Sequence, residues 1–388
     1  MGPGEDKEVC GAIYVGERCN ANFESLYLEG VRVMSHKNVV LVPLHNNMSL
    51  ATAQTIRDIV KFSSELGFSP SYLPPRRTIL SSVSYYRKML SVLKSDFLLV
   101  PYPAIGNPIK TTKLRIFDIK TLELLSKSSS LIVYVYDLPF EQIRYTKSPN
   151  WDSLIDSKMF SIEGILFDVA DKILVFNEAM AEIIRKRYKI PKEKFMYYEI
   201  LDLSVDFVPS SVKDPNQKLK IIIYAGNLHP DRLQALERYL TKVPPTLELW
   251  FVGPNGDWIQ TSLKEPRVRY LGSFYGHEFY TLLLKGDFGL IWYPEGLSEY
   301  LRFGSSSKFS SYLVTGLPVL VDSHAVYVSE LVKRYNVGIT NKNLERLLFK
   351  AKNISNEDYL KLRKNALSLG TKIREGYFFK KVLKAVIE

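Results

Sequence analysis

Apolar, β-rich runs alternate with amphipathic helical stretches along most of the chain. Residues 37–45 form a predicted buried strand, and residues 51–67 carry apolar positions at helical spacing and end at a glycine. Because the runs are apolar on both faces and are separated by helical stretches, we expect parallel sheets. Further strands are predicted at 96–103, 130–139, 171–180, 218–227, 246–256, 267–274, 287–294 and 317–323.

The strands fall into two sets, and residues 208–217 between them are rich in Pro, Ser and Asn, which is typical of an interdomain linker. We therefore predict two doubly wound α/β domains, residues 1–207 and 218–370. Ligands of such sheets bind at the carboxyl ends of the strands, so two facing sheets enclose a cleft. The first 35 residues have no clear place in this pattern.

Length and composition agree with two domains. The chain has 388 residues, of which 46% are hydrophobic, enough for a sizeable core in each domain. No apolar run reaches the roughly 18–20 residues that span a bilayer, and the acidic N-terminus is unlike a secretory signal. We expect a soluble cytoplasmic protein. The sequence does not decide whether the protein contacts the cytoplasmic face of the membrane or forms homo-oligomers.

Cysteine and histidine content argues against metal chemistry. The two cysteines form no CxxC pair, and the five histidines have no HExxH spacing. This excludes a disulfide framework and gives no reason to expect zinc. We expect neither a metal nor a cofactor.

The formal net charge of +11 favours anionic partners. The densest basic runs, at 183–189, 362–365 and 378–384, lie on helical patterns, where a solvated face is the simpler explanation. No RNP, helix-turn-helix or zinc-finger signature is present, so we do not expect nucleic-acid binding.

The segment 221–240 runs from a buried strand through the sequence AGN into a helix. Gly226 permits close backbone approach, Asn227 follows it, and the start of the helix offers free N–H groups to an anion. Arg232 in the first turn can form two hydrogen bonds with a diphosphate. An ordinary loop with a surface arginine explains the pattern equally well. The absence of GxGxxG gives no support to a nicotinamide or flavin site.

Three serines and a lysine open an apolar helical pattern at residues 304–321. Ser305, Ser306 and Ser307 can cap a helix that begins near Lys308. The N-terminus of a helix carries about half a positive charge, which repels Lys308 unless an anion is bound or its side chain turns away. Because local conflicts of this kind often mark function, the segment predicts a site for a phosphorylated ligand.

Aromatic and acidic residues near the other strand ends are further candidates. Phe274 or Tyr275 can stack on a nucleobase, although core packing is the commoner role of such residues. Glu295 and Glu299 precede the serine-rich segment, and a carboxylate there can accept hydrogen bonds from ribose hydroxyls. A solvated loop is the alternative for both glutamates.

Polar residues also follow strands of the N-terminal half. Asp137 stands where the predicted strand 130–139 ends, and it can act as a base toward an acceptor hydroxyl. Asn46, Asn47 and Ser49 follow the first strand and can bind sugar hydroxyls. Turn formation explains these residues at least as well.

These segments resemble the GT-B glycosyltransferases. They are most similar to bacterial glucosyltransferases that extend O-linked N-acetylglucosamine on serine-rich adhesins, and to related β-1,6-galactofuranosyltransferases. The resemblance is strongest in the second half of the chain. It rests on AGNLHPDR (225–232), GDFGLIW (286–292), EY (299–300), SSKFSSYLVTGLPVLV (306–321), VGI (337–339) and IREGYFFKKVL (373–383).

The resemblance implies a UDP-sugar donor bound mainly by the C-terminal domain. It places Arg232 and Lys308 at the UDP diphosphate, Phe274 near the uracil and Glu299 at the glutamate of the family's EY motif. Gln54, within the motif TAQ (52–54), corresponds to the acceptor side. The remaining predicted donor-site residues flank these positions: Gly226, Asn227, Tyr275, Ser306 and Ser307.

Two positions depart from the family pattern. Tyr136 and Asp137 stand where the family has His-Asp, which leaves Asp137 as the candidate base. Ser311 stands where retaining GT-B enzymes carry a glutamate, so the stereochemical course stays open. The resemblance also implies that residues 371–388 form a helix that crosses back to the N-terminal domain.

We therefore expect a metal-independent transferase that moves a hexose, with glucose the simplest choice, from a UDP-sugar to a hydroxyl of a glycan on protein or lipid. Galactose, galactofuranose and N-acetylglucosamine stay open as the sugar. The alternative is a non-catalytic GT-B partner that binds a glycosylated protein or stabilises another transferase.

Overall fold

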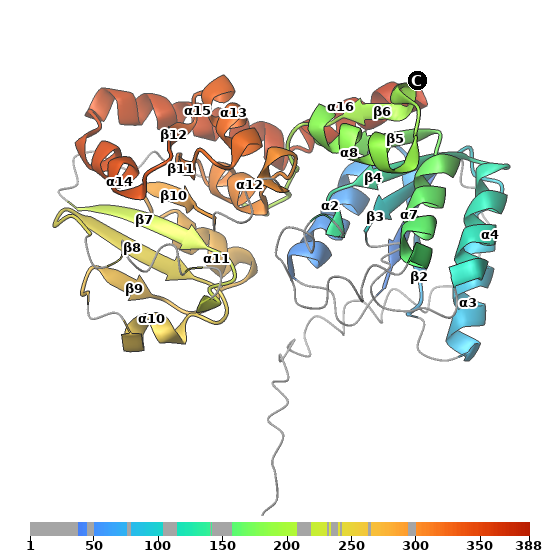
Figure 1. The fold of residues 1–388 in the computed structure, drawn as a ribbon, viewed down its shortest axis with the longest axis horizontal. Helices are drawn as coiled ribbons and strands as arrows, with labels where there is room; N and C mark the ends of the chain where they lie inside the picture. Colours follow the sequence, from blue (N-terminus) through green and yellow to red (C-terminus); the bar gives the residue numbers. More distant parts are fainter. Residues whose placement is uncertain are drawn as a thin grey trace, which may run out of the picture. The chain divides into compact units, whose positions relative to one another are not determined.

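A computed structural model describes most of the chain beyond residue 37. The expected linker 208–217 and the first 35 residues lie outside the described residues. His36–Glu388 form one compact unit, which contains two six-stranded sheets (Figure 1). The described residues are 38–44, 50–75, 79–103, 115–139, 141, 157–207, 219–230, 233, 240, 243–262, 265–293 and 300–388.

The first sheet is parallel, with the order β2-β1-β3-β4-β5-β6. β1, β3 and β4 each have one half-buried residue followed by five buried ones, as expected for strands covered on both faces. The strands are β1 (Asn38–Pro43), β2 (Phe68–Leu73), β3 (Phe97–Tyr102), β4 (Ser130–Val135), β5 (Lys172–Val175) and β6 (Phe195–Tyr197).

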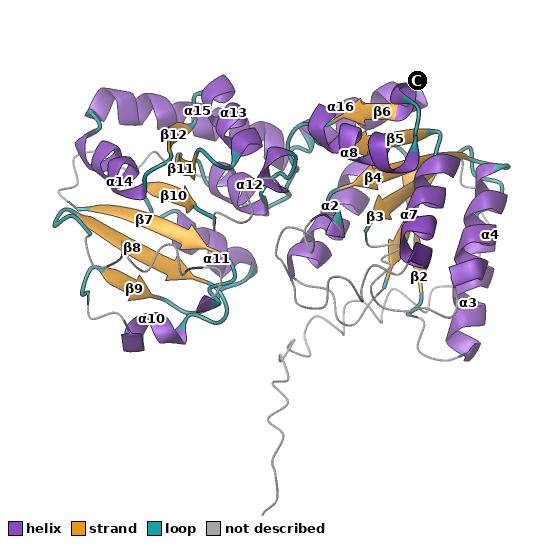
Figure 2. Cartoon of the chain, viewed as in Figure 1, coloured by secondary structure: helices purple, strands orange, loops and turns teal. Residues whose placement is uncertain are grey.

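Helices cover the first sheet. α3 contacts α4, α4 contacts α7 and α7 contacts α8, so these four form a continuous layer (Figure 2). α2 contacts the C-terminal helix α16 instead. The helices are α2 (Leu50–Ser64), α3 (Ile79–Leu90), α4 (Arg115–Ser126), α7 (Ser157–Val169), α8 (Glu178–Tyr188) and α16 (Tyr377–Ile387).

The second sheet is also parallel, in the order β12-β11-β10-β7-β8-β9. Its strands are β7 (Lys220–Ala225), β8 (Leu247–Val252), β9 (Val268–Tyr270), β10 (Phe288–Ile291), β11 (Val319–Asp322) and β12 (Gly338–Asn341). The helices that accompany it are α10 (Asp257–Ser262), α11 (Gly276–Leu283), α12 (Ser307–Val314), α13 (Val326–Tyr335), α14 (Leu344–Asn353) and α15 (Asn356–Arg374), and a 3₁₀ turn, η4, spans Tyr300–Arg302.

The hydrophobic pattern missed β2, β6 and β12, and it carried several predicted strands past their ends: β4 ends at Val135, β8 at Val252 and β9 at Tyr270. β2 has the sequence FSPSYL, and its serines and proline are typical of a loop rather than of an apolar strand. The predicted strand 171–180 ends at Val175, because Asn177 caps the next helix and its Oδ1 accepts a hydrogen bond from the Met180 N–H at 2.9 Å.

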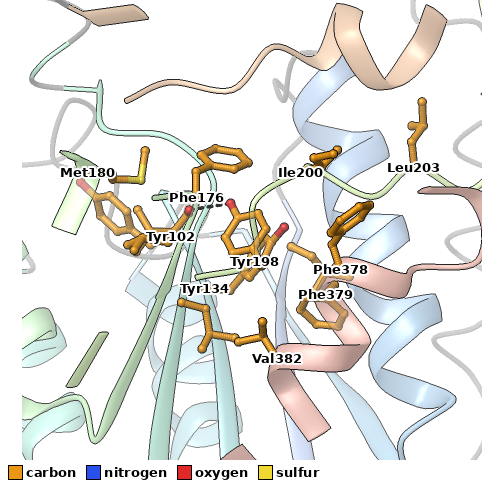
Figure 3. Packing of buried hydrophobic residues seen from close by; sticks show 14 of the residues in the cluster. Tyr102, Tyr134, Phe176, Met180, Tyr198, Ile200, Leu203, Phe378, Phe379 and Val382 are labelled. Carbon is orange, nitrogen blue, oxygen red and sulfur yellow. Dashed lines mark hydrogen bonds between the residues drawn. The ribbon is translucent and has the colours of Figure 1, made fainter. Parts of the chain in front are cut away.

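The C-terminal helix packs on the first sheet's side of the unit. α15 ends at Arg374, and the chain turns at Gly376, whose φ of 69° puts it in the left-handed region. Asp202 accepts a hydrogen bond from the Phe379 N–H at 2.6 Å, which satisfies a free donor in the first turn of α16. Phe379 then packs edge-on against Tyr134, with ring centroids 5.1 Å apart (Figure 3).

Candidate functional site

Two glycines bring the ends of β7 and β8 together. Gly226 follows β7 with φ 146°, and its N–H donates to the Val252 carbonyl at 2.9 Å. Gly253 follows β8 with φ 139°, and a Cβ there would overlap the carbonyl oxygen of Gly226. The Tyr312 hydroxyl accepts a hydrogen bond from the Ala225 N–H at 2.8 Å, which fixes the end of β7. The strand end is therefore held with its backbone close to the neighbouring loop.

Lys308 lies directly beside this strand end. A Cβ on Gly226 would come within 2.7 Å of the Lys308 Cε, so the glycine leaves room for the lysine stem. The Lys308 ammonium lies 4.9 Å from the ring centroid of Tyr224 and 4.9 Å from that of Tyr293. Two aromatic faces thus offset the repulsion between this cation and the N-terminus of α12. We call Tyr224, Gly226, Tyr293, Ser306 and Lys308 the Lys308 cluster.

The serines do not cap α12 as predicted. Ser306 is the N-cap residue by position, but its side chain accepts no hydrogen bond from the helix. Its Oγ instead accepts a hydrogen bond from the Tyr293 hydroxyl at 2.8 Å. The Ser305 Oγ is buried without a hydrogen-bond partner among the described residues, while Ser307 is exposed as the first residue of α12. The side-chain capping prediction is therefore wrong, because Tyr293 competes for Ser306.

Other predicted donor-site residues lie in nearby loops. Asn227 Oδ1 accepts hydrogen bonds from the His229 N–H and from Asn255 Nδ2, both at 3.0 Å, so its side chain braces a turn. Phe274 is half-buried against the core, whereas Tyr275 is 51% exposed immediately before α11. Arg232 and Glu299 lie outside the described residues.

Asp137 follows β4 and is half-buried. Its Oδ1 accepts hydrogen bonds from the Tyr300 hydroxyl at 2.6 Å and from the Leu138 N–H at 2.8 Å. Burial raises the pKa of the Asp137 carboxyl, and these two hydrogen bonds oppose that shift. Tyr300 is the proton donor of the pair, since burial and the nearby carboxylate raise its own pKa further.

A pocket of about 400 Å³ contains Gln54, the predicted acceptor-side residue. Asn46, Asn47 and Ser49 lie outside the described residues. Gln54 Nε2 donates to Asp58 Oδ1 at 2.9 Å, and Gln54 Oε1 accepts from Arg57 at 2.7 Å. The walls of this α2 pocket are Gln54, Arg57, Asp58, Lys61, Ser204, Val205, Asp206, Phe207, Gly276, His277 and Tyr280.

Asp58 is the buried acid of the α2 pocket. It is 3% exposed, and its Oδ1 also accepts a hydrogen bond from the Ser204 N–H at 3.1 Å. Burial raises its pKa to about 7, against the opposing effect of its hydrogen bonds and of the cations Arg57 and Lys61. Sequence reasoning missed this residue, because one aspartate on a helical pattern carries no sign of burial.

Glu163 on α7 is a second buried acid that the sequence did not reveal. The hydroxyls of Tyr102 and Tyr188 both donate to its carboxylate. Burial raises its pKa to about 7, and the two tyrosines oppose the shift. Burial is the main cause of the raised pKa of Tyr102, and the Glu163 carboxylate raises that pKa further.

Within the ranges described above, no three His, Cys, Asp or Glu side chains gather in a way that could hold a metal ion. In the same ranges, no helix combines the length and the apolar character needed to cross a bilayer.

Comparison with solved structures decides the fold. The sucrose-phosphate synthase (tll1590) from Thermosynechococcus elongatus superposes with a TM-score of 0.61 at 10% identity, over 90% of this chain and 98% of that one. An alpha-glucosyltransferase (AGT) in complex with UDP gives a TM-score of 0.60 at 13% identity, over 90% of this chain and 100% of that one. The chain has a GT-B fold. The predicted fold class is confirmed.

The sequence similarity of this GT-B chain to known glucosyltransferases lies mainly in its second half. Residues 222–386 match the family model for the glucosyltransferase 3-like, C-terminal domain. Glucosyltransferase 3 of Streptococcus parasanguinis is 32% identical over 99 residues, which cover 26% of this chain and 30% of that protein. The match to glucosyltransferase 3 of Streptococcus gordonii covers 38% of that protein. The chain thus spans about a third of the length of these relatives.

A longer but weaker match extends beyond the second half. Beta-1,6-galactofuranosyltransferase WbbI of Escherichia coli (strain K12) is 25% identical over 236 residues, which cover 58% of this chain and 66% of that protein. The chain therefore resembles a GT-B glucosyltransferase of the glucosyltransferase 3 kind, as its motifs predicted.

Proposed function

We propose that the protein is a glycosyltransferase that moves a hexose from a UDP-sugar to a hydroxyl of a glycan acceptor. The observation that carries the proposal is the Lys308 cluster, because it lies inside the segment that matches the glucosyltransferase 3-like domain. A cation at a strand end and at the start of a helix suits a diphosphate. Glucose is the first choice of sugar, and WbbI keeps galactofuranose open.

The donor half of the mechanism concerns the leaving group. Lys308 and the free N–H groups at the start of α12 would neutralise the charge that develops on UDP as the bond to the anomeric carbon breaks. Arg232 is assigned to the same diphosphate by position. These cations take the place that a metal ion holds in other transferases, so we propose that the reaction is metal-independent.

Asp137 is the proposed base. The acceptor hydroxyl would give its proton to the Asp137 carboxylate while its oxygen bonds to the anomeric carbon and UDP departs. Burial supports this role, because a raised pKa makes the carboxylate a better proton acceptor near neutral pH. Tyr300 would hold the carboxylate in place and limit how far its pKa rises.

The α2 pocket is the proposed binding place for acceptor sugar units. Phe207 has its ring centroid 5.7 Å from that of Tyr280 and 6.4 Å from that of His277, so aromatic rings form one wall. The lining also offers both donors and acceptors from α2, including Arg57 and Asp58. Sugar hydroxyls require both kinds of partner, whereas an anion requires donors alone.

Turnover is tested with a panel of UDP-glucose, UDP-galactose, UDP-galactofuranose and UDP-N-acetylglucosamine. UDP release is measured with and without the methyl glycoside of N-acetylglucosamine, in the presence of EDTA. Release from one donor that is lost in Asp137→Asn supports the proposal. Tight binding of UDP-sugars without release or transfer would instead support the non-catalytic partner, and a requirement for added metal would contradict the metal-independent reaction.

A further inference from the structure

The described residues of α3 and α4 carry an unusual concentration of exposed apolar side chains. Leu80 is 82% exposed, Val83 61% and Leu90 38% on α3, and Leu124 is 46% exposed on α4. Isolated exposed leucines are ordinary, but a contiguous apolar surface usually marks an interaction site. α3 and α4 contact each other in one helix layer (Figure 1), so the exposed side chains of both helices lie on the outside of that layer.

Helical spacing places the three α3 residues on one stripe. Leu80, Val83, Arg87 and Leu90 follow the i, i+3, i+7, i+10 pattern, which keeps them on one side of a helix. The opposite side of α3 carries the buried residues Tyr85 and Met89. The helix is therefore apolar on two sides, and only one of these sides is needed for the core.

Exposed cations accompany the exposed apolar side chains on both helices. Arg87, Lys88 and Lys94 are exposed on and after α3, and Lys120 and Lys127 are exposed on either side of Leu124. In the part of the chain that the structure describes, none of these five forms an ion pair with a carboxylate. Among the residues of these two helices and their ends whose side chains the structure describes, the exposed carboxylates are Asp96 and Glu123, so positive charge prevails there.

We propose that this α3–α4 surface, defined by Leu80, Val83, Arg87, Lys88, Leu90, Lys94, Lys120, Leu124 and Lys127, docks on the surface of a bilayer that contains anionic phospholipids. Apolar side chains can enter the region between headgroups and acyl chains, while neighbouring cations pair with lipid phosphates. The long stems of lysine and arginine let their charges reach the headgroups from the edge of an apolar patch. A second copy of the chain fits less well, since a two-fold contact would face these cations against each other.

The test is co-sedimentation of the full chain with vesicles. Wild-type protein should bind vesicles of phosphatidylcholine and phosphatidylglycerol, bind pure phosphatidylcholine vesicles weakly, and lose binding as salt is raised. The double variant Leu80→Asp, Val83→Asp should bind the anionic vesicles at least about tenfold more weakly than the wild-type protein does. Arg87→Glu with Lys88→Glu should weaken binding to the anionic vesicles alone.

Phe349→Asp is the matched control, because Phe349 is 64% exposed on α14, away from this surface. It should leave vesicle binding unchanged. Thermal unfolding and UDP binding of each variant separate lost docking from lost folding. Equal vesicle binding by wild type and the double variant would overturn the proposal. A second outcome would also overturn it: the wild-type protein does not bind vesicles but forms a dimer at high concentration, and the double variant is monomeric at the same concentration. The surface would then be a contact between two copies of the chain.

Discussion

The Tyr300 hydroxyl donates a hydrogen bond to Asp137 Oδ1 at 2.6 Å, although 163 positions separate the two residues along the chain. Asp137 follows a strand of the first sheet, and Tyr300 opens the turn η4 that follows the second sheet's β10. The position and the pKa of the proposed base therefore depend on Tyr300, a residue from the second half of the chain. A hydrogen bond to the ionised form of a carboxylate lowers its pKa, so this contact tunes the base.

Removal of this hydroxyl gives a pH prediction. Tyr300→Phe should raise the pKa of Asp137, since burial remains while one hydrogen bond to the carboxylate is lost. A base acts when it is ionised, so the acidic limb of the kcat/KM profile should move to higher pH. Asp137→Asn should lower kcat about 100-fold or more at every pH.

Tyr335→Phe is the matched control for Tyr300→Phe, because the Tyr335 hydroxyl also donates to a carboxylate, that of Glu199, at 2.8 Å. The control should leave the pH profile unchanged. A shift of the acidic limb to lower pH in Tyr300→Phe, or no loss of rate in Asp137→Asn, contradicts the assignment of the base.

Asp58 should make the folded state less stable as the pH rises. Its folded pKa of about 7 exceeds the ordinary value of 3.8, so the folded chain holds a proton that the unfolded chain releases. Its stabilising contribution is complete below the unfolded pKa and is lost as pH rises through the folded pKa. Between about pH 4 and pH 8 the loss is on the order of 2–4 kcal/mol.

The free energy of unfolding is measured at several pH values by urea unfolding followed by circular dichroism. Asp58→Asn should reduce the fall of this free energy with rising pH, and at high pH the variant should be more stable than wild type. Glu163, whose pKa is also about 7, leaves a residual slope. Asp206→Asn, an exposed change in the same pocket, is the control and should track wild type. If the unfolding free energies of wild type and Asp58→Asn fall equally with pH, the raised pKa of Asp58 is contradicted.

Two glycine-to-alanine changes should separate backbone strain from steric overlap. Gly253 and Gly272 both have positive φ, 139° and 94°, but only at Gly253 would a Cβ meet another backbone. Gly272→Ala should cost about 1–2 kcal/mol of unfolding free energy, and Gly253→Ala about 3 kcal/mol or more. Denaturant titration measures both. Equal costs would mean that the loops after β7 and β8 can separate freely.

Much of the fold was predictable, because apolar strands in a parallel sheet produce a strong and regular pattern. The failures have local causes. β2 contains Pro70 and two serines, and β12 is a half-buried strand of only four residues, so neither gives an apolar run. The predicted strand 171–180 overran because Phe176 is apolar and the capping role of Asn177 depends on the neighbouring helix.

The candidate site was only partly predictable. The conflict at Lys308 was visible in the sequence, but its resolution by Tyr224 and Tyr293 was not, because these rings come from the ends of two other strands. The same holds for Ser306, whose capping role is displaced by Tyr293. Asp58 and Glu163 show that burial, which raises a carboxyl pKa, depends on contacts that one sequence does not display.

The central claim is that the Lys308 cluster binds the diphosphate of a UDP-sugar, and calorimetric titration with UDP tests it most directly. Lys308→Ala should raise the dissociation constant about 10- to 100-fold, the usual effect of losing a hydrogen bond to a charged group. Lys333→Ala, an exposed lysine in the last turn of α13, should bind UDP like wild type. An unchanged UDP affinity in a folded Lys308→Ala variant would contradict the account.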